Sequence, residues 1–369
     1  MKARKKKVLL VFGTRPEAIK MLPIIKVLEK STILETKICV SGQHRKMLDQ
    51  VLNTFNIKPH YDLDIMVENQ TLKMVTERIL NEFTKILCIE KPDAVLVHGD
   101  TTTAFAAALA SYYMQIRIGH IEAGLRTYQK TPFPEEFNRI SIDHMSTYCF
   151  APTQTAYINL INEGINKDSI ILSGNTVVDV FKYTIQNNYS HELLLWSKTK
   201  QLILLTVHRR ENQGEIMETI FRAVKRSMIV LDNVVLIYPV HYNPKIQKMA
   251  FEMLSSCHNI KLIEPLSVID FHNIMNNADL VITDSGGVQE EALILQKPLL
   301  VIREHTERVE IKNCFHAKII GISENDIYNS ILKFMDLKVD KQRNRNTSVT
   351  PFGDGLAAER IVNTLETMD

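Results

Sequence analysis

The sequence predicts an α/β protein with two doubly wound, Rossmann-like domains that face each other across a cleft. Short apolar, β-branched runs alternate with longer segments of helical period along the 369 residues. This alternation predicts βαβ units and parallel sheets buried on both faces. The strand-like runs form two sets of six, and two sheets of six strands fit usual sheet sizes better than one sheet of twelve. A regular barrel is the main rival, but the strand count and the motif positions favour two sheets.

The strands are predicted from apolar runs that end at Gly, Pro or polar residues. A polar stretch, Asn187–Lys200, separates the two sets, and Asn175 is an earlier candidate hinge. We therefore place the first domain at 1–174 and the second at 175–354. The first set of strands comprises Lys7–Gly13, Thr36–Gly42, Asp93–Gly99, Arg117–Ile121, Tyr148–Pro152 and Ile170–Gly174; the second comprises Leu202–Val207, Val234–Val240, Ile260–Glu264, Leu280–Thr283, Pro298–Arg303 and Lys318–Ile322.

The composition limits the kinds of binding partner and the cellular compartment that we expect for this protein. The formal net charge of +2 gives no reason to propose nucleic acid as a partner. The five cysteines are scattered and form no CxxC pair, which argues against a disulfide framework or a structural metal site and favours a reducing compartment. The basic start is followed by only a short apolar run, Val8–Phe12, and no segment approaches the roughly 20 apolar residues of a membrane span. We expect a cytoplasmic protein without a membrane partner.

Three acidic residues lie at positions that suggest proton transfer. Asp100 ends an apolar run, Glu122 follows another, and Glu135 follows a Pro-Phe-Pro turn. The carboxyl ends of strands border the ligand crevice in open α/β sheets, so Asp100 and Glu122 should face one space. Crowding and burial there would push the carboxyl pKa values apart, as acid–base catalysis requires. The structural alternatives are a helix N-cap for Asp100, an ion pair of Glu122 with Arg126, and a helix-dipole role for Glu135 or Glu136.

The first strand leads into a capped helix. Thr14 and Glu17 have capping-box spacing, and Pro16 suits a first helical turn. Arg15 and Lys20 could meet an anion near the free N–H groups of that turn, or could simply face solvent. There is no GxGxxG motif, so a dinucleotide fingerprint is not supported.

A second turn of this kind follows the predicted strand Leu280–Thr283. Gly286 and Gly287 would let a ligand approach the backbone closely, and the helix start favours phosphate. Ser285 could cap the helix or donate to a phosphate oxygen. Glu291, one to two turns into the helix, could accept ribose hydroxyls. The alternative is an ordinary Ser-capped helix with a packing glycine.

His208 ends the first strand of the second half, in Thr206-Val-His-Arg-Arg-Glu-Asn212. Histidine titrates near neutrality, so it could donate a proton or bind phosphate, and Arg209 and Arg210 add cations for a diphosphate. A structural role is the alternative for His208. His241 is similarly placed, and we rank it below His208 as a candidate site residue.

The ordered motifs of this chain closely resemble those of the bacterial non-hydrolysing UDP-N-acetylglucosamine 2-epimerases. The likeness runs from Val11 to the last predicted helix. It is carried by Phe12-Gly-Thr-Arg-Pro-Glu-Ala-Ile-Lys20, Gln43-His-Arg, His98-Gly-Asp-Thr-Thr-Thr103, His120-Ile-Glu-Ala-Gly-Leu-Arg-Thr127, Pro134-Glu-Glu, Gly174-Asn-Thr, His208-Arg-Arg-Glu-Asn212, Asp284-Ser-Gly-Gly, Thr306-Glu-Arg and Gly353-Asp-Gly.

The resemblance implies a glycosyltransferase-B architecture, in which the last helix, 355–369, joins the first domain. It also implies a reversible C2 epimerisation of UDP-N-acetylglucosamine to UDP-N-acetylmannosamine. UDP would leave by anti elimination to give 2-acetamidoglucal and would then add back, without any cofactor or metal. The implied catalytic residues are Asp100, Glu122, Glu135 and His208; the implied substrate-binding residues are Arg15, Lys20, Leu266, Phe271, Ser285, Gly286, Gly287, Glu291 and Arg308.

Relatives of this kind bind a second UDP-sugar as an activator, and the resemblance implies a homodimer. The residues that match the activator site are Gln43, His44, Glu136 and Arg210. Relatives often have Gln or Glu at the position of Lys46 and Arg at the position of Asn69.

The alternative activities are a hydrolysing 2-epimerase, which would release UDP and N-acetylmannosamine, and a glycosyltransferase of the same fold.

Overall fold

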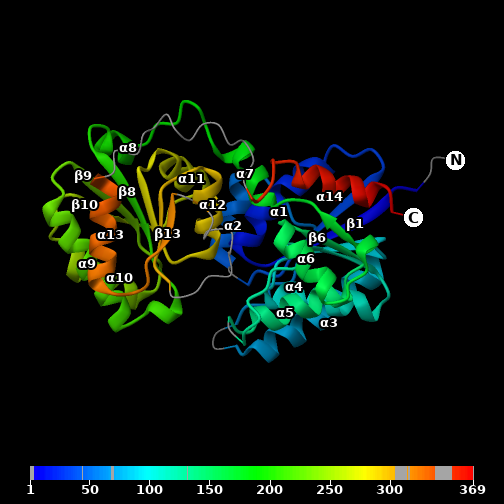
Figure 1. Ribbon diagram of the computed structural model, residues 1–369. Helices are drawn as coiled ribbons and strands as arrows, with labels where there is room; N and C mark the ends of the chain where they lie inside the picture. Colours follow the sequence, from blue (N-terminus) through cyan, green and yellow to red (C-terminus); the bar gives the residue numbers. More distant parts are fainter. Residues whose placement is uncertain are drawn as a thin grey trace. The chain divides into compact units, whose positions relative to one another are not determined.

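The computed structural model describes residues 4–43, 45–67, 70–130, 132–303, 314, 316–336 and 351–368, except for the side chain of Arg210. The described chain divides into two compact units (Figure 1). Unit 1 contains Met1–Val180 and Pro351–Asp369, and unit 2 contains Phe181–Thr350. The division falls inside helix α7 (Thr176–Thr184), whereas the predicted domain boundary lies at 174/175.

Unit 1 is built around a seven-stranded parallel sheet in the order β3-β2-β1-β4-β5-β6-β7. Its strands are β1 (Lys6–Phe12), β2 (Leu34–Val40), β3 (Tyr61–Asp62), β4 (Ala94–His98), β5 (Arg117–Ile121), β6 (Tyr148–Ala151) and β7 (Ile170–Leu172). Its helices are α1 (Arg15–Leu28), α2 (Arg45–Thr54), α3 (Leu72–Glu90), α4 (Thr102–Tyr113), α5 (Glu135–Met145), α6 (Gln154–Asn162), the first part of α7, and α14 (Ala357–Glu366), with a short 3₁₀ turn at Lys167–Ser169.

Unit 2 contains a six-stranded parallel sheet in the order β10-β9-β8-β11-β12-β13. Its strands are β8 (Gln201–Thr206), β9 (Val234–Pro239), β10 (Ile260–Ile263), β11 (Leu280–Thr283), β12 (Leu299–Val301) and β13 (Ala317–Ile319). Its helices are the rest of α7, α8 (Glu192–Ser197), α9 (Glu215–Val230), α10 (Pro244–Leu254), α11 (Val268–Asn277), α12 (Gly286–Ile294) and α13 (Glu324–Asp336), with a 3₁₀ turn at Arg210–Asn212.

The predicted α/β class with two parallel sheets is confirmed. All twelve predicted strands are present, with ends that move by a few residues. The prediction of six strands in the first sheet is wrong, because β3 adds a seventh at the edge. β3 has only two residues, Tyr61 and Asp62, which is too short to show a hydrophobic period.

Each unit has its own apolar core, which explains why the central strands are almost wholly apolar. Residues Val8 to Phe12 of β1 and Ala94 to Val97 of β4 are fully buried. Parallel strands with helices on both faces need such continuous apolar runs. The last helix, α14, packs against α1 in unit 1, so the red end of the ribbon lies beside the blue start in Figure 1.

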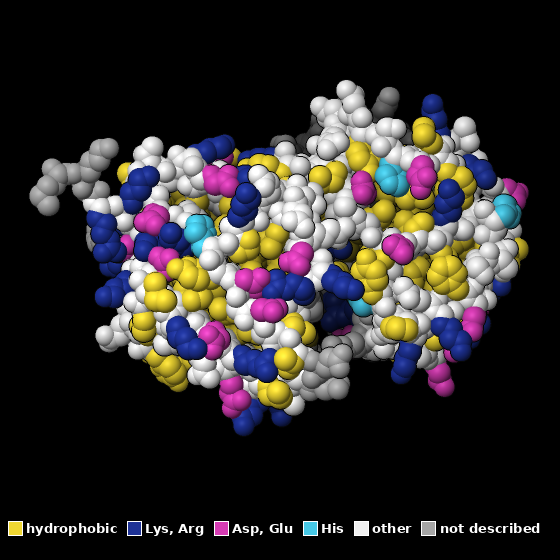
Figure 2. Space-filling model, turned by 180° about the vertical axis from the view of Figure 1, so that it is seen from behind, with side chains coloured by type: hydrophobic (Ala, Val, Ile, Leu, Met, Phe, Trp, Pro, Cys, Tyr) yellow, Lys and Arg dark blue, Asp and Glu magenta, His cyan; other side chains and the backbone are white. Residues whose placement is uncertain are grey.

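Charged side chains of both signs are interspersed over the face in Figure 2. This distribution agrees with the small net charge of +2. Within the described ranges, no helix is long and apolar enough to cross a membrane.

Candidate functional site

Each sheet reverses its strand order at one point of its own, and several candidate residues lie on the turns that follow the strands there. In unit 1, β1 pairs with β2 on one side and β4 on the other, and in unit 2, β8 pairs with β9 and β11. Ligands of open α/β sheets bind outside the carboxyl ends of the strands at such switch points. The turns after β1 and β4, and those after β8 and β11, are therefore the places to look for function.

The turn after β1 is joined to the turn after β4 by Glu17. The predicted capping box of Thr14 and Glu17 is confirmed, and Glu17 Oε2 accepts from the N–H groups of Gly13 (2.9 Å) and Thr14 (2.7 Å). Its other oxygen accepts from the Thr101 hydroxyl at 2.7 Å. Burial raises the pKa of Glu17, although these hydrogen bonds oppose the rise. Glu17 thus fixes the two turns of the switch point to each other.

Gly13 is required by close packing at this turn. A Cβ atom there would lie 2.0 Å from Ser41 Oγ and 2.6 Å from Thr103 Oγ1. The two hydroxyls are 2.9 Å apart, and Thr103 donates to Gln43 Oε1 at 3.0 Å. Gln43, which the resemblance assigns to an activator site, is thereby held beside the first turn.

Glu122 has a left-handed backbone and forms an ion pair with a buried lysine. Its φ of 72° lies in the left-handed region, which a non-glycine residue rarely adopts outside functional or tightly held sites. Lys20 of α1 forms an ion pair with Glu122 Oε1, and each side chain is only 10% exposed. Asn175 Nδ2 donates to the same oxygen at 3.3 Å. The alternative ion pair with Arg126 is wrong.

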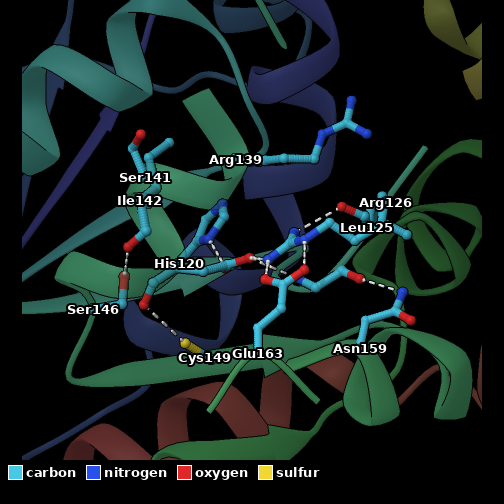
Figure 3. Close-up of polar contacts among 12 residues, drawn as sticks. His120, Leu125, Arg126, Arg139, Ser141, Ile142, Ser146, Cys149, Asn159 and Glu163 are labelled. Atoms are coloured by element: carbon cyan, nitrogen blue, oxygen red, sulfur yellow. Dashed lines mark hydrogen bonds and ion pairs between the residues drawn. The ribbon is translucent and has the colours of Figure 1, made fainter. Parts of the chain in front are cut away.

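Arg126 instead belongs to a buried network around Asp143 (Figure 3). Its Nη2 lies 2.7 Å from Asp143 Oδ2 and 2.5 Å from Glu163 Oε2. His120 lies in the same network, with its Nδ1 2.6 Å from Asp143 Oδ1 and its Nε2 2.8 Å from the Gly99 carbonyl oxygen. Burial alone would raise the pKa of Asp143, but His120 and Arg126 hold it below its usual value. This network fixes the ends of β4 and β5 beside the candidate carboxylates.

Asp100 leaves β4 one residue after Gly99 and is bound by helix α5. Arg139 Nε and Nη2 both donate to Asp100 Oδ2, at 3.1 and 2.5 Å. Asn138 donates to the Asp100 carbonyl at 2.8 Å. The N-cap alternative for Asp100 is wrong, because Thr101 is the N-cap of α4 and accepts from Ala104 N–H. The carboxylate is thus available for a role other than capping.

Glu135 and Glu136 begin α5 and differ in environment. Glu135 is the first helical residue and is partly exposed. Glu136 is buried, accepts from the N–H groups of Thr127 and Tyr128 at 2.9 Å each, and pairs with Arg139 at 3.0 Å. Both acidic residues lie in the first turn, where a helix dipole favours negative charge.

His98 is a buried group that is not among the predicted site residues. It is the last residue of β4, is 3% exposed, and its Nε2 has no hydrogen-bond partner within the described part of the chain. Burial lowers its pKa to about 4; the nearby Glu122 opposes the shift and Lys20 adds to it. His98 is therefore neutral at physiological pH.

In unit 2, Asp284 connects the turns after β8 and β11. It is fully buried, and its carboxylate accepts from the N–H groups of His208 (3.1 Å to each oxygen) and Arg209 (3.0 Å) and from the Asn212 amide (2.9 Å). The His208 ring stacks on His241, with centroids 5.4 Å apart. His208 is therefore placed at the switch point of unit 2, as its position at a strand end predicts.

The helix after β11 starts as predicted, but its serine does not cap it. Ser285 is the N-cap residue of α12, and its side chain makes no capping hydrogen bond. A Cβ added to Gly287 would meet no atom of the described residues within 4 Å, so this glycine is not needed for packing against them. The capping and packing explanations therefore do not account for Ser285 and Gly287, which favours a ligand at this helix start.

The remaining candidates of unit 2 lie around α11 and α12. Glu291 is on α12, 3.5 Å from His272 Nε2, and His272 bonds Thr184 through Nδ1 at 2.8 Å. Leu266 precedes α11, and Phe271 lies on it; both are partly buried. Arg15 is partly buried at the start of α1 in unit 1.

Several predicted residues lie outside the part of the chain that the structure describes. These are His44, Asn69, Arg308 and the side chain of Arg210. Lys46 is described and lies on α2.

Sequence reasoning missed Arg139 and Asn175, which donate to Asp100 and Glu122, and the buried groups His98 and Asp143. Only Arg139 left a local signal, since it stands three residues after Glu136 on a helix, a spacing typical of ion pairs. Asp143 and Asn175 act through contacts that are distant in sequence.

The fold and the two switch points define a Rossmann-like α/β protein of the kind that binds ligands at the carboxyl ends of its strands. Residues 26–366 match the model of the family described as UDP-N-acetylglucosamine 2-epimerase. The chain belongs to this family.

Individual relatives agree over nearly the whole chain. The UDP-N-acetylglucosamine 2-epimerase of Bacillus subtilis is 46% identical over 363 residues, which is 98% of this chain and 95% of the relative. The structure of S. aureus MnaA with UDP has a TM-score of 0.91 at 46% identity, over 98% of this chain and 96% of that one. The Neisseria meningitidis UDP-GlcNAc 2-epimerase bound to UDP-GlcNAc has a TM-score of 0.90 at 42% identity, over 97% and 99%.

Proposed function

We propose that this protein reversibly converts UDP-N-acetylglucosamine to UDP-N-acetylmannosamine without hydrolysis. A base removes the C2 proton while the C1–O bond breaks, so that UDP leaves and 2-acetamidoglucal forms. A proton then returns to C2 from the opposite face, and UDP adds back at C1. The observation that carries the proposal is the pair of carboxylates, Asp100 and Glu122, that follow β4 and β5 of unit 1 in a chain of this family.

The proton transfers are assigned to unit 1. Inversion by removal and return of a proton requires acid–base groups on both faces of C2. Asp100, Glu122 and Glu135 are the candidates. Support for Glu122 comes from its left-handed backbone and its buried Lys20 partner, and support for Asp100 from the two hydrogen bonds of Arg139.

Departure of UDP is assigned to unit 2. The first-turn N–H groups of α12, next to Gly286 and Gly287, have no partners within the helix and favour a diphosphate. His208 would supply a proton or a hydrogen bond to the leaving group. Glu291 is assigned to the ribose and the Leu266–Phe271 segment to the uracil. Arg15, Lys20 and Arg308 are assigned to the charged part of the substrate.

Incubation with UDP-N-acetylglucosamine in D₂O tests the proposal. We expect the manno epimer to form and to carry deuterium at C2, as NMR of the nucleotide sugars would show. Free N-acetylmannosamine as the main product would instead identify a hydrolysing epimerase, and sugar transfer without C2 exchange would identify a glycosyltransferase. A substrate that keeps its C2 proton and gives no epimer would refute the proposal.

Substitution of the carboxylates tests their assigned roles. Asp100→Asn and Glu122→Gln should each lower kcat by at least about 10²-fold, the usual contribution of a general acid or base, with little change in UDP affinity. Glu77→Gln on the exposed face of α3 is the matched control and should behave like the wild type. A near-wild-type kcat in either site variant would remove that residue from the mechanism.

We further propose that the enzyme is a cytoplasmic homodimer and that a second UDP-sugar acts as an activator. Gln43, His44, Glu136 and Arg210 are assigned to the activator. Sedimentation tests the dimer. A rate that rises with added UDP-N-acetylglucosamine when UDP-N-acetylmannosamine is the substrate would support the activator.

A further inference from the structure

We propose that Arg139 is a positioning residue that holds Asp100 by one carboxylate oxygen and ties it, through Glu136, to the chain segment after Glu122. The effect on catalysis rests on the proposed epimerase function, whereas the chain of contacts itself does not.

Arg139 lies between two carboxylates and is almost completely buried. Its side chain is 4% exposed, against 28% for Asp100 and 7% for Glu136. Nε and Nη2 donate to Asp100, and Nη1 donates to Glu136 at 3.0 Å. A planar guanidinium with bonds in two directions fixes the relative orientation of the groups that it binds.

Glu136 extends this arrangement to the backbone. Its Oε1 accepts from the N–H groups of Thr127 and Tyr128, and its Oε2 accepts from Arg139. These two backbone groups lie in the segment that leads from Glu122 to Glu135. One helical turn of α5 therefore binds both Asp100 and the chain segment that connects Glu122 to Glu135.

The hydrogen bonds of Arg139 also select one oxygen of Asp100. Both go to Oδ2, and no contact within the described ranges involves Oδ1. With 28% of its side chain exposed, Asp100 is still open to a ligand. Oδ1 is thus the oxygen that exchanges a proton with substrate, while Arg139 prevents the carboxylate from turning.

Arg126 cannot replace Arg139 in this role. Figure 3 shows the Arg139 guanidinium pointing away from the group formed by His120, Arg126 and Glu163. Arg126 forms its ion pairs with Asp143 and Glu163 instead. Removal of Arg139 therefore leaves Asp100 without a cation among the contacts of the described chain.

The kinetic test compares Arg139→Gln, Arg139→Ala and Arg139→Lys. We expect Arg139→Gln to lower kcat by about 10²-fold, the cost of a small misplacement of a reacting group, with KM changed by less than about threefold. Guanidinium ions should restore part of the activity of Arg139→Ala, and Arg139→Lys should be intermediate. Arg222→Gln, which removes an arginine between Glu218 and Glu324 on the surface of unit 2, is the control and should leave kcat unchanged.

Hydrogen exchange tests the contact chain without any activity. Arg139→Gln and Glu136→Gln should each speed exchange of the Thr127 and Tyr128 amides by at least about tenfold, since those amides lose a firmly held acceptor. Wild-type exchange at these amides in both variants would overturn the proposal, as would a kcat near that of the wild type in Arg139→Gln. If the wild type makes no epimer, the proposed function fails, and the exchange result alone then decides whether Arg139 couples Asp100 to this segment.

Discussion

His98 shows how the interior of unit 1 sets the charge of a single residue. Its folded pKa of about 4 lies below the usual histidine pKa of 6.5, so between these values the unfolded chain binds a proton that the folded chain does not. Stability therefore rises with pH through this window, by about 1.4 kcal/mol per pH unit and about 3 kcal/mol in all. We expect His98→Gln to lose this dependence, as native-state hydrogen exchange of β4 amides between pH 4 and 7 would show.

The comparison with wild type isolates the contribution of His98, because carboxylates such as Glu17 and Asp143 titrate in both proteins. An unchanged slope in His98→Gln would mean that His98 is protonated in the folded protein above pH 5. That result would contradict the burial argument.

The elements that carry the site differ in how much of their role the sequence reveals. The capping box at α1, the strand ends and the helix start at Ser285 follow from local spacing and were predicted. The partner of Glu122 was not, because Lys20 is 102 residues away, whereas Arg126 is close in sequence but is bound by Asp143 and Glu163. Local patterns place a residue at a sheet edge; they do not decide which of several nearby charges it pairs with.

Helix α12 offers a test that separates folding from binding. The backbone of Gly287 is not left-handed, and a Cβ there would meet no atom of the described chain within 4 Å. Gly287→Ala should therefore stabilise unit 2 slightly, by up to about 1 kcal/mol. If a diphosphate approaches this turn, the added methyl group should weaken UDP binding at least about tenfold. Calorimetry with UDP and thermal unfolding measure the two effects.

Gly164→Ala provides the opposite control. A Cβ added at Gly164 would also meet no described atom within 4 Å, but the φ of this residue is 83°, so alanine is strained there. We expect lower stability with unchanged UDP affinity. Unchanged UDP affinity in Gly287→Ala would argue against a diphosphate at this helix start.

At the scale of the whole molecule, unit 1 depends on a helix that comes after unit 2 in the chain. Ile361 of α14 is fully buried. Ile361→Ala should cost unit 1 about 2–5 kcal/mol, the range for large-to-small core substitutions. Hydrogen exchange should quicken in β1 and β4 and stay unchanged in β8 and β11. Glu359→Ala, on the exposed side of the same helix, is the control, and equal effects in both units would refute independent cores.

The contacts of Asp179 set an order of events during synthesis. Its carboxylate accepts from the N–H groups of Ala357 and Ala358, at 3.3 and 3.2 Å, and so supplies the N-terminal cap that α14 lacks locally. The backbone N–H of Asn175 also donates to the Phe352 carbonyl, at 2.7 Å, and so adds a second link between these two parts of the chain. Domains generally fold as units while the chain is made. A ribosome delivers all of unit 2 before α14, so the second sheet can close on the nascent chain while the first still exposes the face of α1 that α14 will cover.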